Sequence, residues 1–391
     1  MTEWNETYLS AVLADKGYIR GPFGSALKRG DMKENGIPVY EQQHAIYDSR
    51  NFRYYIDEKK FNEMKRFQVM KDDLIISCSG TVGKVSIIKD DDPKGIISQA
   101  LLLLRVDINK ILPMYLKYFF SSRDGYNAIV SRSSGSVQVN IAKRNVIEQI
   151  PLRVPTIKTQ EKIVGLLSSI DKKIEENGRI NKNLEQQAQA IYQQMFIDNA
   201  SSDWAEGTLS NIADITMGQS PSGSSYNEDG NGTIFFQGRA EFGFRFPTVR
   251  LYTTEPKRMA CANDTLMSVR APVGDLNVAH TDCCIGRGLA AIHSKNNHQS
   301  FVLYTMFSLK KQLDVFNGEG TVFGSINRNS LNEMPILIPS SEKLDEFEAL
   351  VAPMDAAIRN NYDEICRLEQ LRDSLLPQLM SGALDVSDIE L

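Results

Sequence analysis

Cysteine and histidine are scarce in this chain of 391 residues, and their scarcity excludes several kinds of chemistry. The cysteines are odd in number and show neither CxxC spacing nor neighbouring histidines, so we expect neither a disulfide framework nor a zinc site. They are interpreted as small core residues: Cys78, Cys261, Cys283, Cys284 and Cys366. The four histidines do not form the HExxH pattern of zinc proteases. The sequence therefore predicts no metal and no other cofactor.

Long hydrophobic runs are also missing. Residues Met1 to Ser10 are polar and acidic, unlike a secretory signal, and the apolar run from Gly95 to Val106 is too short to span a bilayer. We therefore expect a cytoplasmic protein without membrane contact. Hydrophobic residues make up 42% and charged residues 24% of the chain, which is typical of a globular protein with two or more domains.

The sequence also lacks a convincing catalytic or nucleotide-binding loop. The segment SGTVGKV, from Ser79 to Val85, resembles a phosphate-binding loop, but its glycines are too close together and Val85 replaces the magnesium-binding Ser or Thr. The segment GEGTVFG, from Gly318 to Gly324, lacks the GxGxxG spacing and is better interpreted as a turn. With no convincing methyl-donor loop or nuclease carboxylate cluster, the sequence favours a binding module over an enzyme.

What the sequence does contain is a long helical segment that occurs twice. The first copy runs from about Thr156 to Ile197 and follows the boundary IPLRVP; the second follows MPILIP and runs to about Leu376. Adding 184 to a residue number in the first copy gives the matching residue of the second, without a gap. An internal repeat of this kind decides the architecture.

Apolar residues in both copies alternate spacings of three and four over more than four heptads, which predicts a coiled coil. One such stripe cannot stay buried alone along a helix of about 60 Å, so the two copies are predicted to pair with each other. Asn177 and Asn361 lie near the middle of the stripes, where they could meet and fix the register. The alternative is an ordinary core helix whose apolar face is interrupted by a polar residue. The predicted pairing residues are Ile170, Ile174, Asn177, Leu184, Met354, Ile358, Asn361 and Leu368.

The repeat extends into the globular segments before the helices. The two tryptophans, Trp4 and Trp204, open similar segments at an offset of 200. The offset then falls steadily, to 191 for DLIISCSGTVG against DTLMSVRAPVG, 188 for ISQALLLL against IGRGLAAI, and 185 for GSVQVNIAKRN against GTVFGSINRN. The second copy is thus the first with short loop deletions. Strands are predicted at 74–77, 96–106, 266–269 and 288–292, and helices at 113–120 and 301–316.

These patterns predict an α+β chain of two repeated mixed α/β domains, each followed by a long helix. The expected boundaries are 1–155 and 203–340 for the domains, 156–202 and 341–380 for the helices, and 381–391 for an acidic tail. The net charge of −5 is concentrated in the second helix and the tail. The globular segments are near neutral or mildly basic, which permits DNA binding without demonstrating it.

Two unequal domains, each followed by a long helix entered through IPLRVP or MPILIP, resemble the specificity subunit of type I restriction-modification enzymes. SVRAPVG (268–274) and CIGRGLAAI (284–292) are similar to the family's second-domain signatures. Gln160-Glu161 resembles the family's helix opening, although the second copy has Leu344-Asp345 there. The resemblance covers essentially the whole chain.

This resemblance implies two target-recognition domains joined by antiparallel helices, each domain reading one half of a split, asymmetric site in double-stranded DNA. It also implies docking of two methyltransferase subunits and of restriction subunits, with the chain supplying specificity and no chemistry. Apolar residues beside the pairing stripe suggest a surface for partner helices, with a thicker two-helix core as the alternative: Leu166, Ile180, Tyr192, Phe196, Leu350, Tyr362, Leu376 and Met380.

Candidate DNA-binding residues fall into two groups. Positions that match between the copies suit phosphates, whereas base readers should differ because the two halves of the target differ. Lys143 and Arg328 match and are predicted to contact phosphates. Arg and Gln can bond guanine and adenine bidentately. On that basis the unmatched loop candidates are Lys28, Arg29, Gln43, His44, Arg132, Gln219, Arg239, Arg270 and Arg287.

Two rival functions remain open at this stage. A fused restriction-methylation enzyme, or a fragment of one, would need a catalytic domain for which the two repeats leave no room. A coiled-coil adaptor that binds only proteins would show no DNA sequence preference when assembled with its partners.

Overall fold

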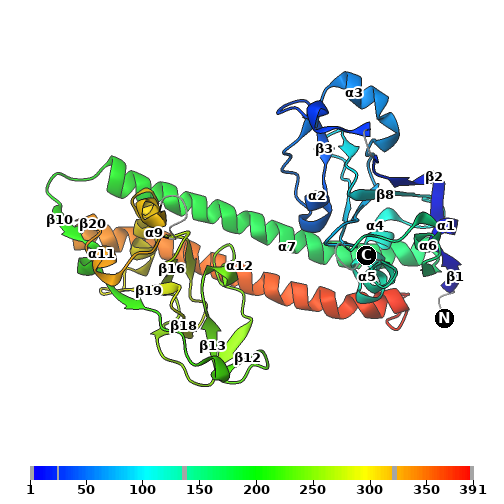
Figure 1. Cartoon of the computed structure of the whole chain (residues 1–391). Helices are drawn as coiled ribbons and strands as arrows, with labels where there is room; N and C mark the ends of the chain where they lie inside the picture. The colour runs from blue at the N-terminus through cyan, green and yellow to red at the C-terminus, as the bar shows by residue number, and fades with distance from the viewer. Residues whose placement is uncertain (1–3, 24–25, 134–138, 319–323, 388–391) are drawn as a thin grey trace. The chain divides into compact units, whose positions relative to one another are not determined.

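The computed structural model describes residues 4–23, 26–133, 139–318 and 324–387 (Figure 1). Their contacts divide the chain into two units. Unit 1 comprises Met1–Glu176 together with Glu364–Leu391, and unit 2 comprises Asn177–Asp363. Unit 1 therefore combines segments from both ends of the chain, whereas unit 2 is continuous in sequence.

Unit 1 is built around a four-stranded antiparallel sheet in the order β2 (Leu13–Arg20), β8 (Leu101–Val106), β5 (Leu74–Ser77), β6 (Val85–Ile87). Every residue of β5 is buried, which explains its unbroken apolar run. A smaller sheet has the order β4 (Tyr55–Ile56), β3 (Ile37–Tyr40), β7 (Ile96–Ile97), with β3 and β7 parallel. Strand β1 (Trp4–Tyr8) pairs with β9 (Pro151–Pro155).

Short helices complete the domain part of unit 1. Helix α4 begins at Pro113, where the missing N–H of proline costs no hydrogen bond, and it buries Tyr115, Leu116, Tyr118 and Phe120. The helices of this part are α1 (Leu9–Val12), α2 (Gln42–Tyr47), α3 (Glu58–Glu63), α4 (Pro113–Ser121), α5 (Arg123–Val130) and α6 (Arg144–Ile147), with 3-10 turns η2 (Arg29–Asp31) and η3 (Lys65–Phe67).

Unit 2 repeats this topology. Its four-stranded sheet has the order β11 (Ala213–Met217), β19 (Leu289–Ser294), β16 (Thr265–Ser268), β17 (Leu276–Val278). Its second sheet has the order β12 (Tyr226–Asn227), β14 (Leu251–Thr253), β13 (Thr233–Phe236), β18 (Cys283–Ile285), β15 (Met259–Ala260), and here too the central pair, β13 and β18, is parallel. Strand β10 (Ala205–Thr208) pairs with β20 (Pro335–Ile338). The shared strand order confirms the predicted duplication, with β12 and β15 as additional strands of the second sheet in unit 2.

The helices of unit 2 also follow those of unit 1. They are α8 (Leu209–Ile212), α9 (Gln299–Ser308), α10 (Lys310–Leu313) and α11 (Arg328–Asn332), with 3-10 turns η5 (Gly223–Ser225), η6 (Arg239–Glu241) and η7 (Asp314–Asn317). Helix α9 corresponds to α4 of unit 1. It is buried almost all round, and its Phe301 ring packs against the rings of Tyr192, Phe196 and Phe347.

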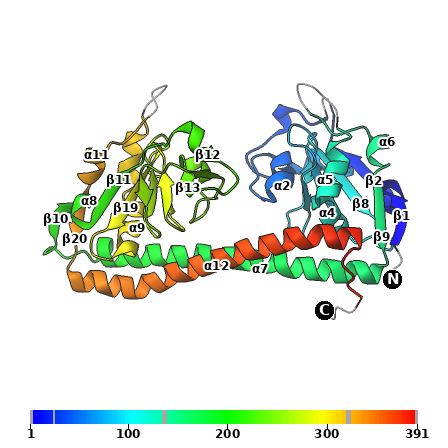
Figure 2. The ribbon, with the colours of Figure 1, turned by 90° about the horizontal axis from the view of Figure 1, so that it is seen from below.

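The two long helices are α7 (Ile157–Tyr192), which ends in the π-helical turn η4 (Gln193–Asp198), and α12 (Ser341–Ser381). Each unit contains a part of both, and within each unit they run side by side (Figures 1 and 2). In unit 1, Asp171 contacts Arg372 at 3.1 Å and Lys173 contacts Glu364 at 3.7 Å. One residue number rises as the other falls, so the predicted antiparallel pairing is confirmed.

The predicted pairing stripe is turned inward. Ile170, Asn177 and Ile358 are buried, and the other predicted pairing residues, Ile174, Leu184, Met354, Asn361 and Leu368, are half-buried. Asn361 has a partner that the sequence did not predict. Its side-chain Nδ2 donates to Oδ1 of Asn181 at 2.8 Å, so the asparagine opposite Asn361 lies one turn after Asn177.

Several local predictions need correction. The expected strand 96–106 is divided between β7 and β8, and the expected helix 301–316 is divided among α9, α10 and η7. Of the cysteines, Cys78, Cys283 and Cys284 are buried, but Cys261 is exposed and Cys366 is half-buried. The tail is not simply an acidic extension, because Val386 is only 2% exposed; residues 388–391 lie outside the described residues, as do 319–323 of the Gly318–Gly324 turn.

The apolar residues predicted to receive partner helices are also partly reassigned. Tyr192, Phe196, Leu376 and Met380 are buried in the cores of their own units. Ile180 and Leu350 are exposed, at 43% and 48%. These four side chains pack with residues of the domains, which corresponds neither to a surface for partner helices nor to a core of two helices alone. Within the described ranges, no helix is long and apolar enough to cross a bilayer.

Candidate nucleic-acid interface

A groove of about 360 Å³ brings together several polar side chains at one edge of unit 1. Arg29 comes from η2, Gln43 from α2, Arg53 from the segment before β4, and Gln99 from the turn between β7 and β8. Arg53 is anchored by Glu41, with Nη2 and Nε donating to the two carboxylate oxygens at 2.7 and 3.0 Å. The carboxylate of Glu41 raises the pKa of Arg53, so the guanidinium stays charged.

Helix α2 holds the neighbouring loop in place. Oε1 of Gln42 accepts hydrogen bonds from the backbone N–H groups of Cys78 and Ser79, at 3.2 and 2.9 Å, and its Nε2 donates to the carbonyl of Ser79. The loop that resembled a phosphate-binding loop turns at Gly80 and Gly83, which both have positive φ angles. One glutamine therefore fixes the loop after β5 to the helix that lines the groove.

His44 is not a base reader, and that prediction is wrong. Its side chain is completely buried, and its ring lies 4.6 Å from the ring of Phe52. Nδ1 accepts from the backbone N–H of Glu41 at 2.7 Å, and Nε2 lies 3.1 Å from the carbonyl of Asn51. Burial lowers the pKa of His44 and keeps the ring neutral. Its role is to cap α2 and fill the core.

The other candidates of unit 1 differ in their availability. Lys28 and Lys143 are exposed, each at the residue that precedes a short helical turn. Arg132 is half-buried, and its Nη1 donates to the carbonyl of Ala128 at 2.8 Å. Gln43 is half-buried in the groove, with Nε2 at 3.3 Å from the carbonyl of Asn51. Arg29 and Gln43 therefore share one surface.

In unit 2, Gln219 and Arg287 are brought together on two adjoining turns. The N–H of Gln219 donates to the carbonyl of Ile285 at 2.9 Å, and the N–H of Arg287 donates to Oγ of Ser220 at 3.3 Å. Both side chains are exposed. The turn needs glycine at position 286, since a Cβ there would lie 2.7 Å from the carbonyl oxygen of Gln237.

The remaining candidates of unit 2 have different surroundings. Arg239 is partly exposed, but its Nε donates to Asp275 at 2.6 Å, which ties it into a local ion pair. Arg270 is exposed and lies beside Ser325 through a β-bridge. Arg328 is exposed as the first residue of α11. Among the described residues no group of His, Cys, Asp and Glu could hold a metal ion.

Arg53 and Gln99 were missed by the sequence interpretation. No signal marks Arg53, because the fold alone brings it to the groove. Gln99 did carry a signal, since the offset of 188 places it at the position of Arg287. It follows β7 as Arg287 follows β18, and both side chains are exposed.

Comparison with known proteins gives one consistent family. A model of the type I restriction modification DNA specificity domain matches residues 24–186 and 201–359. The putative type I restriction enzyme MjaX specificity subunit of Methanocaldococcus jannaschii is 30% identical over 359 residues, covering 85% of this chain and 83% of that protein. The type I restriction enzyme HindI specificity subunit of Haemophilus influenzae is 21% identical over 386 residues, covering 77% of this chain and 84% of that one.

A solved structure agrees with the fold. The S subunit of a type I restriction-modification system from M. genitalium superimposes with a TM-score of 0.63 at 15% identity, covering 99% of this chain and 97% of that chain. At that identity the likeness speaks for the fold alone. The two matched domains, the duplicated topology and the paired helices together show that this chain belongs to the family of DNA specificity subunits of type I restriction-modification enzymes.

Proposed function

We propose that each unit reads one block of a bipartite, asymmetric site in double-stranded DNA. The observation that carries this proposal is the pair Gln99 and Arg287. The same turn of the duplicated fold presents an exposed glutamine in unit 1 and an exposed arginine in unit 2. Glutamine suits adenine and arginine suits guanine in the major groove, so one framework is equipped for two different base sequences.

Matched cations support the same proposal. Lys143 and Arg328 are exposed at equivalent positions of the two copies, beside α6 and α11. Because they keep their charge in both copies, they fit contacts to phosphates, which position a protein without reading sequence. Arg29 and Gln43 in the groove of unit 1, and Gln219 and Arg270 in unit 2, are the further candidates for base contacts. Lys28, Arg132 and Arg239 remain weaker candidates.

The proposal includes partner subunits. Two methyltransferase subunits would supply the chemistry that this chain lacks, and restriction subunits would join that assembly. Exposed apolar side chains on the long helices support a docking surface for partner helices: Ile180, Leu350 and Leu371. Each would bury apolar surface on association, which stabilises a complex.

Selection of bound sequences from a random double-stranded library tests this function. The chain, assembled with its methyltransferase subunits, should select two different short blocks whose centres lie about 10 base pairs apart. Gln99→Arg should then change one position of one block towards guanine, and Arg287→Gln should change one position of the other block towards adenine. Each variant is the control for the other, because each should leave the second block as it was.

A single contiguous site, or a substitution that altered both blocks, would contradict independent reading by the two units. An assembly without any sequence preference would favour the protein-only adaptor. Methyl transfer from labelled S-adenosylmethionine to DNA by the purified chain alone would show instead that the chain is itself an enzyme.

A further inference from the structure

Asp171 and Asp355 occupy the same position in the two copies of the long helix, and each receives a tyrosine hydroxyl from the domain packed on it. Tyr118 of α4 donates to Oδ2 of Asp171 at 2.7 Å in unit 1. Tyr304 of α9 donates to Oδ1 of Asp355 at 2.9 Å in unit 2. Burial raises the pKa of both tyrosines, so their hydroxyls remain protonated donors. The same contact thus joins domain and helix in both units.

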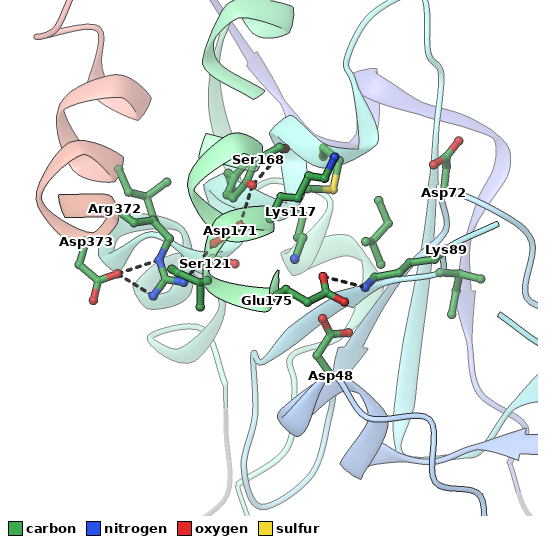
Figure 3. Close-up of a pocket in the computed structure, with 17 residues that line it drawn as sticks. Asp48, Asp72, Lys89, Lys117, Ser121, Ser168, Asp171, Glu175, Arg372 and Asp373 are labelled. Atoms are coloured by element: carbon green, nitrogen blue, oxygen red, sulfur yellow. Dashed lines mark hydrogen bonds and ion pairs between the residues drawn. The ribbon is translucent and has the colours of Figure 1, made fainter. Parts of the chain in front are cut away.

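Each carboxylate is also paired with an arginine, but the arginine comes from a different element in each unit. In unit 1 it is Arg372 of α12, whose Nη1 lies 3.1 Å from Oδ1 of Asp171 and whose side chain is 29% exposed (Figure 3). The residue of α7 that corresponds to Arg372 in the repeat is Ala188, which is completely buried in unit 2. The helix itself cannot supply the arginine there.

In unit 2 the recognition domain supplies it. Arg245 lies in the segment between η6 and β14, and its side chain is 4% exposed. Its Nη2 donates both to Oδ1 of Asp355 and to the hydroxyl of Tyr304, each at 2.8 Å. Its Nε lies 3.5 Å from Oε2 of Glu185 on α7. Arg245 therefore connects the domain to both long helices.

Unit 1 has no such connection among its described residues. In unit 2 the backbone N–H of Val278 donates to the carbonyl of Arg245. The repeat counterpart of Val278 in unit 1 is Ile87, and the arginine that bonds to Ile87 is Arg50. Arg50 is held by Asp92 and Asp48, at 2.7 and 3.3 Å, and makes no ion pair with Asp171. The arginine that pairs with the helix aspartate thus comes from α12 in unit 1 and from the domain in unit 2.

We propose that Asp171 and Asp355 are positioning residues that fix how each recognition domain sits on its helix pair, and that the arginine completing each contact is interchangeable between helix and domain. The two units then differ in the strength of this contact. That of unit 2 is buried and includes two carboxylates, Glu185 and Asp355, which would lose their cation together. That of unit 1 is partly solvated, and there the domain reaches Asp171 through Tyr118.

The test is a transplant that follows the repeat. Hydrogen exchange by mass spectrometry on the full chain would monitor α9 of unit 2, with α4 of unit 1 as internal reference. Arg245→Ala should speed exchange in α9 by on the order of 100-fold, because it leaves buried charges unpaired, while α4 is unaffected. Adding Ala188→Arg should restore most of the protection. Adding Ala188→Leu, which supplies volume without charge, should not.

A second comparison does not need the Ala188→Arg substitution and so remains informative if that variant folds poorly. Asp355→Asn should speed exchange less in the Arg245→Ala background than in the parent chain, because the carboxylate it removes is already unpaired there. Unchanged exchange in α9 after Arg245→Ala would overturn the proposal. So would rescue by leucine as good as rescue by arginine, or equal effects of Asp355→Asn in both backgrounds.

The positioning role itself rests on the proposed function and needs a DNA readout. Below its unfolding temperature, the Arg245→Ala chain assembled with methyltransferase subunits should keep the base preferences of both blocks but accept additional separations between them. The Ala188→Arg combination should return a single separation. Altered base preference at unaltered separation would refute positioning. A parent chain that selects no bipartite site would instead refute the proposed function and leave the exchange result standing.

Discussion

The asparagine pair between the long helices of unit 2 allows a stability prediction to be worked from the structure. Asn361 donates from Nδ2 to Oδ1 of Asn181 at 2.8 Å, and Asn181 donates from its own Nδ2 to the carbonyl of Ile358 at 3.2 Å. Asn181 is only 3% exposed, whereas Asn361 is half-buried. The two side chains therefore differ in what they can do after losing their partner.

Asn361→Leu leaves a buried amide oxygen on Asn181 without a donor. We expect this to lower the free energy of unfolding by about 1–3 kcal/mol. Asn181→Leu should cost less, about 0.5–1.5 kcal/mol, because the amide of Asn361 can turn to water. With both replaced by leucine, no polar group of the pair is stranded and the chain should lie within about 1 kcal/mol of the parent.

Calorimetry of the full chain, with hydrogen exchange to assign the transition to unit 2, measures these differences. For a unit of this size, Asn361→Leu should lower the midpoint by roughly 2–12 °C and the double variant should recover most of that loss. Losses that simply add in the double variant would refute the reasoning. So would a larger cost for Asn181→Leu than for Asn361→Leu.

Three further predictions follow from individual residues. Burial lowers the pKa of His44, so the unfolded chain binds a proton more readily than the folded chain. The free energy of unfolding of unit 1 should therefore fall by up to about 1.4 kcal/mol per pH unit as the pH falls below about 6.5. Unfolding curves of the His44→Gln variant at pH 7.5 and 5.5 should lack this loss. Gly382 has a φ of +78°, and a Cβ there would lie 2.8 Å from the ring of Trp4. Gly382→Ala should therefore destabilise unit 1 by about 1–3 kcal/mol in denaturant titrations. The control Gly223→Ala, at a position with no atom near the added Cβ, should be nearly neutral. Lys143→Ala and Arg328→Ala should each weaken DNA binding equally for all sequences. Each should also reduce the slope of log affinity against log salt concentration by about one. A loss of affinity that depended on the DNA sequence would contradict their assignment to phosphates.

The architecture could be predicted because duplication leaves a record in the sequence. The constant offset of 184 between the helices and the falling offsets between the domains are visible without coordinates, and the strand orders of the two units agree with them. Side-chain partners were harder to predict. Asn361 bonds to Asn181, which the sequence did not single out, because the stagger of two antiparallel helices depends on packing along their whole length.

The contacts of polar residues were even harder to predict from the sequence. His44 was grouped with base readers by residue type, yet its ring is buried, because the backbone of Glu41 and Asn51 satisfies both nitrogens. Arg245 is separated by 110 residues from Asp355, and nothing local to either marks the pair. Equivalence between repeats is the one guide that would have helped, since it places Gln99 with Arg287 and Ala188 with Arg372.

The division of the chain into units has a consequence for its synthesis. Unit 2 is continuous, from Asn177 to Asp363, but the core of unit 1 includes Leu376, Leu379, Met380 and Val386, which leave the ribosome only after unit 2. At about 5–20 residues per second, the first 176 residues wait roughly 10–40 s for these partners. During that interval the core of unit 1, to which Ile163 and Leu167 of α7 belong, lacks the side chains that α12 contributes. The domain that is made first is therefore the one completed last, and it is the part of the nascent chain with most need of protection from aggregation.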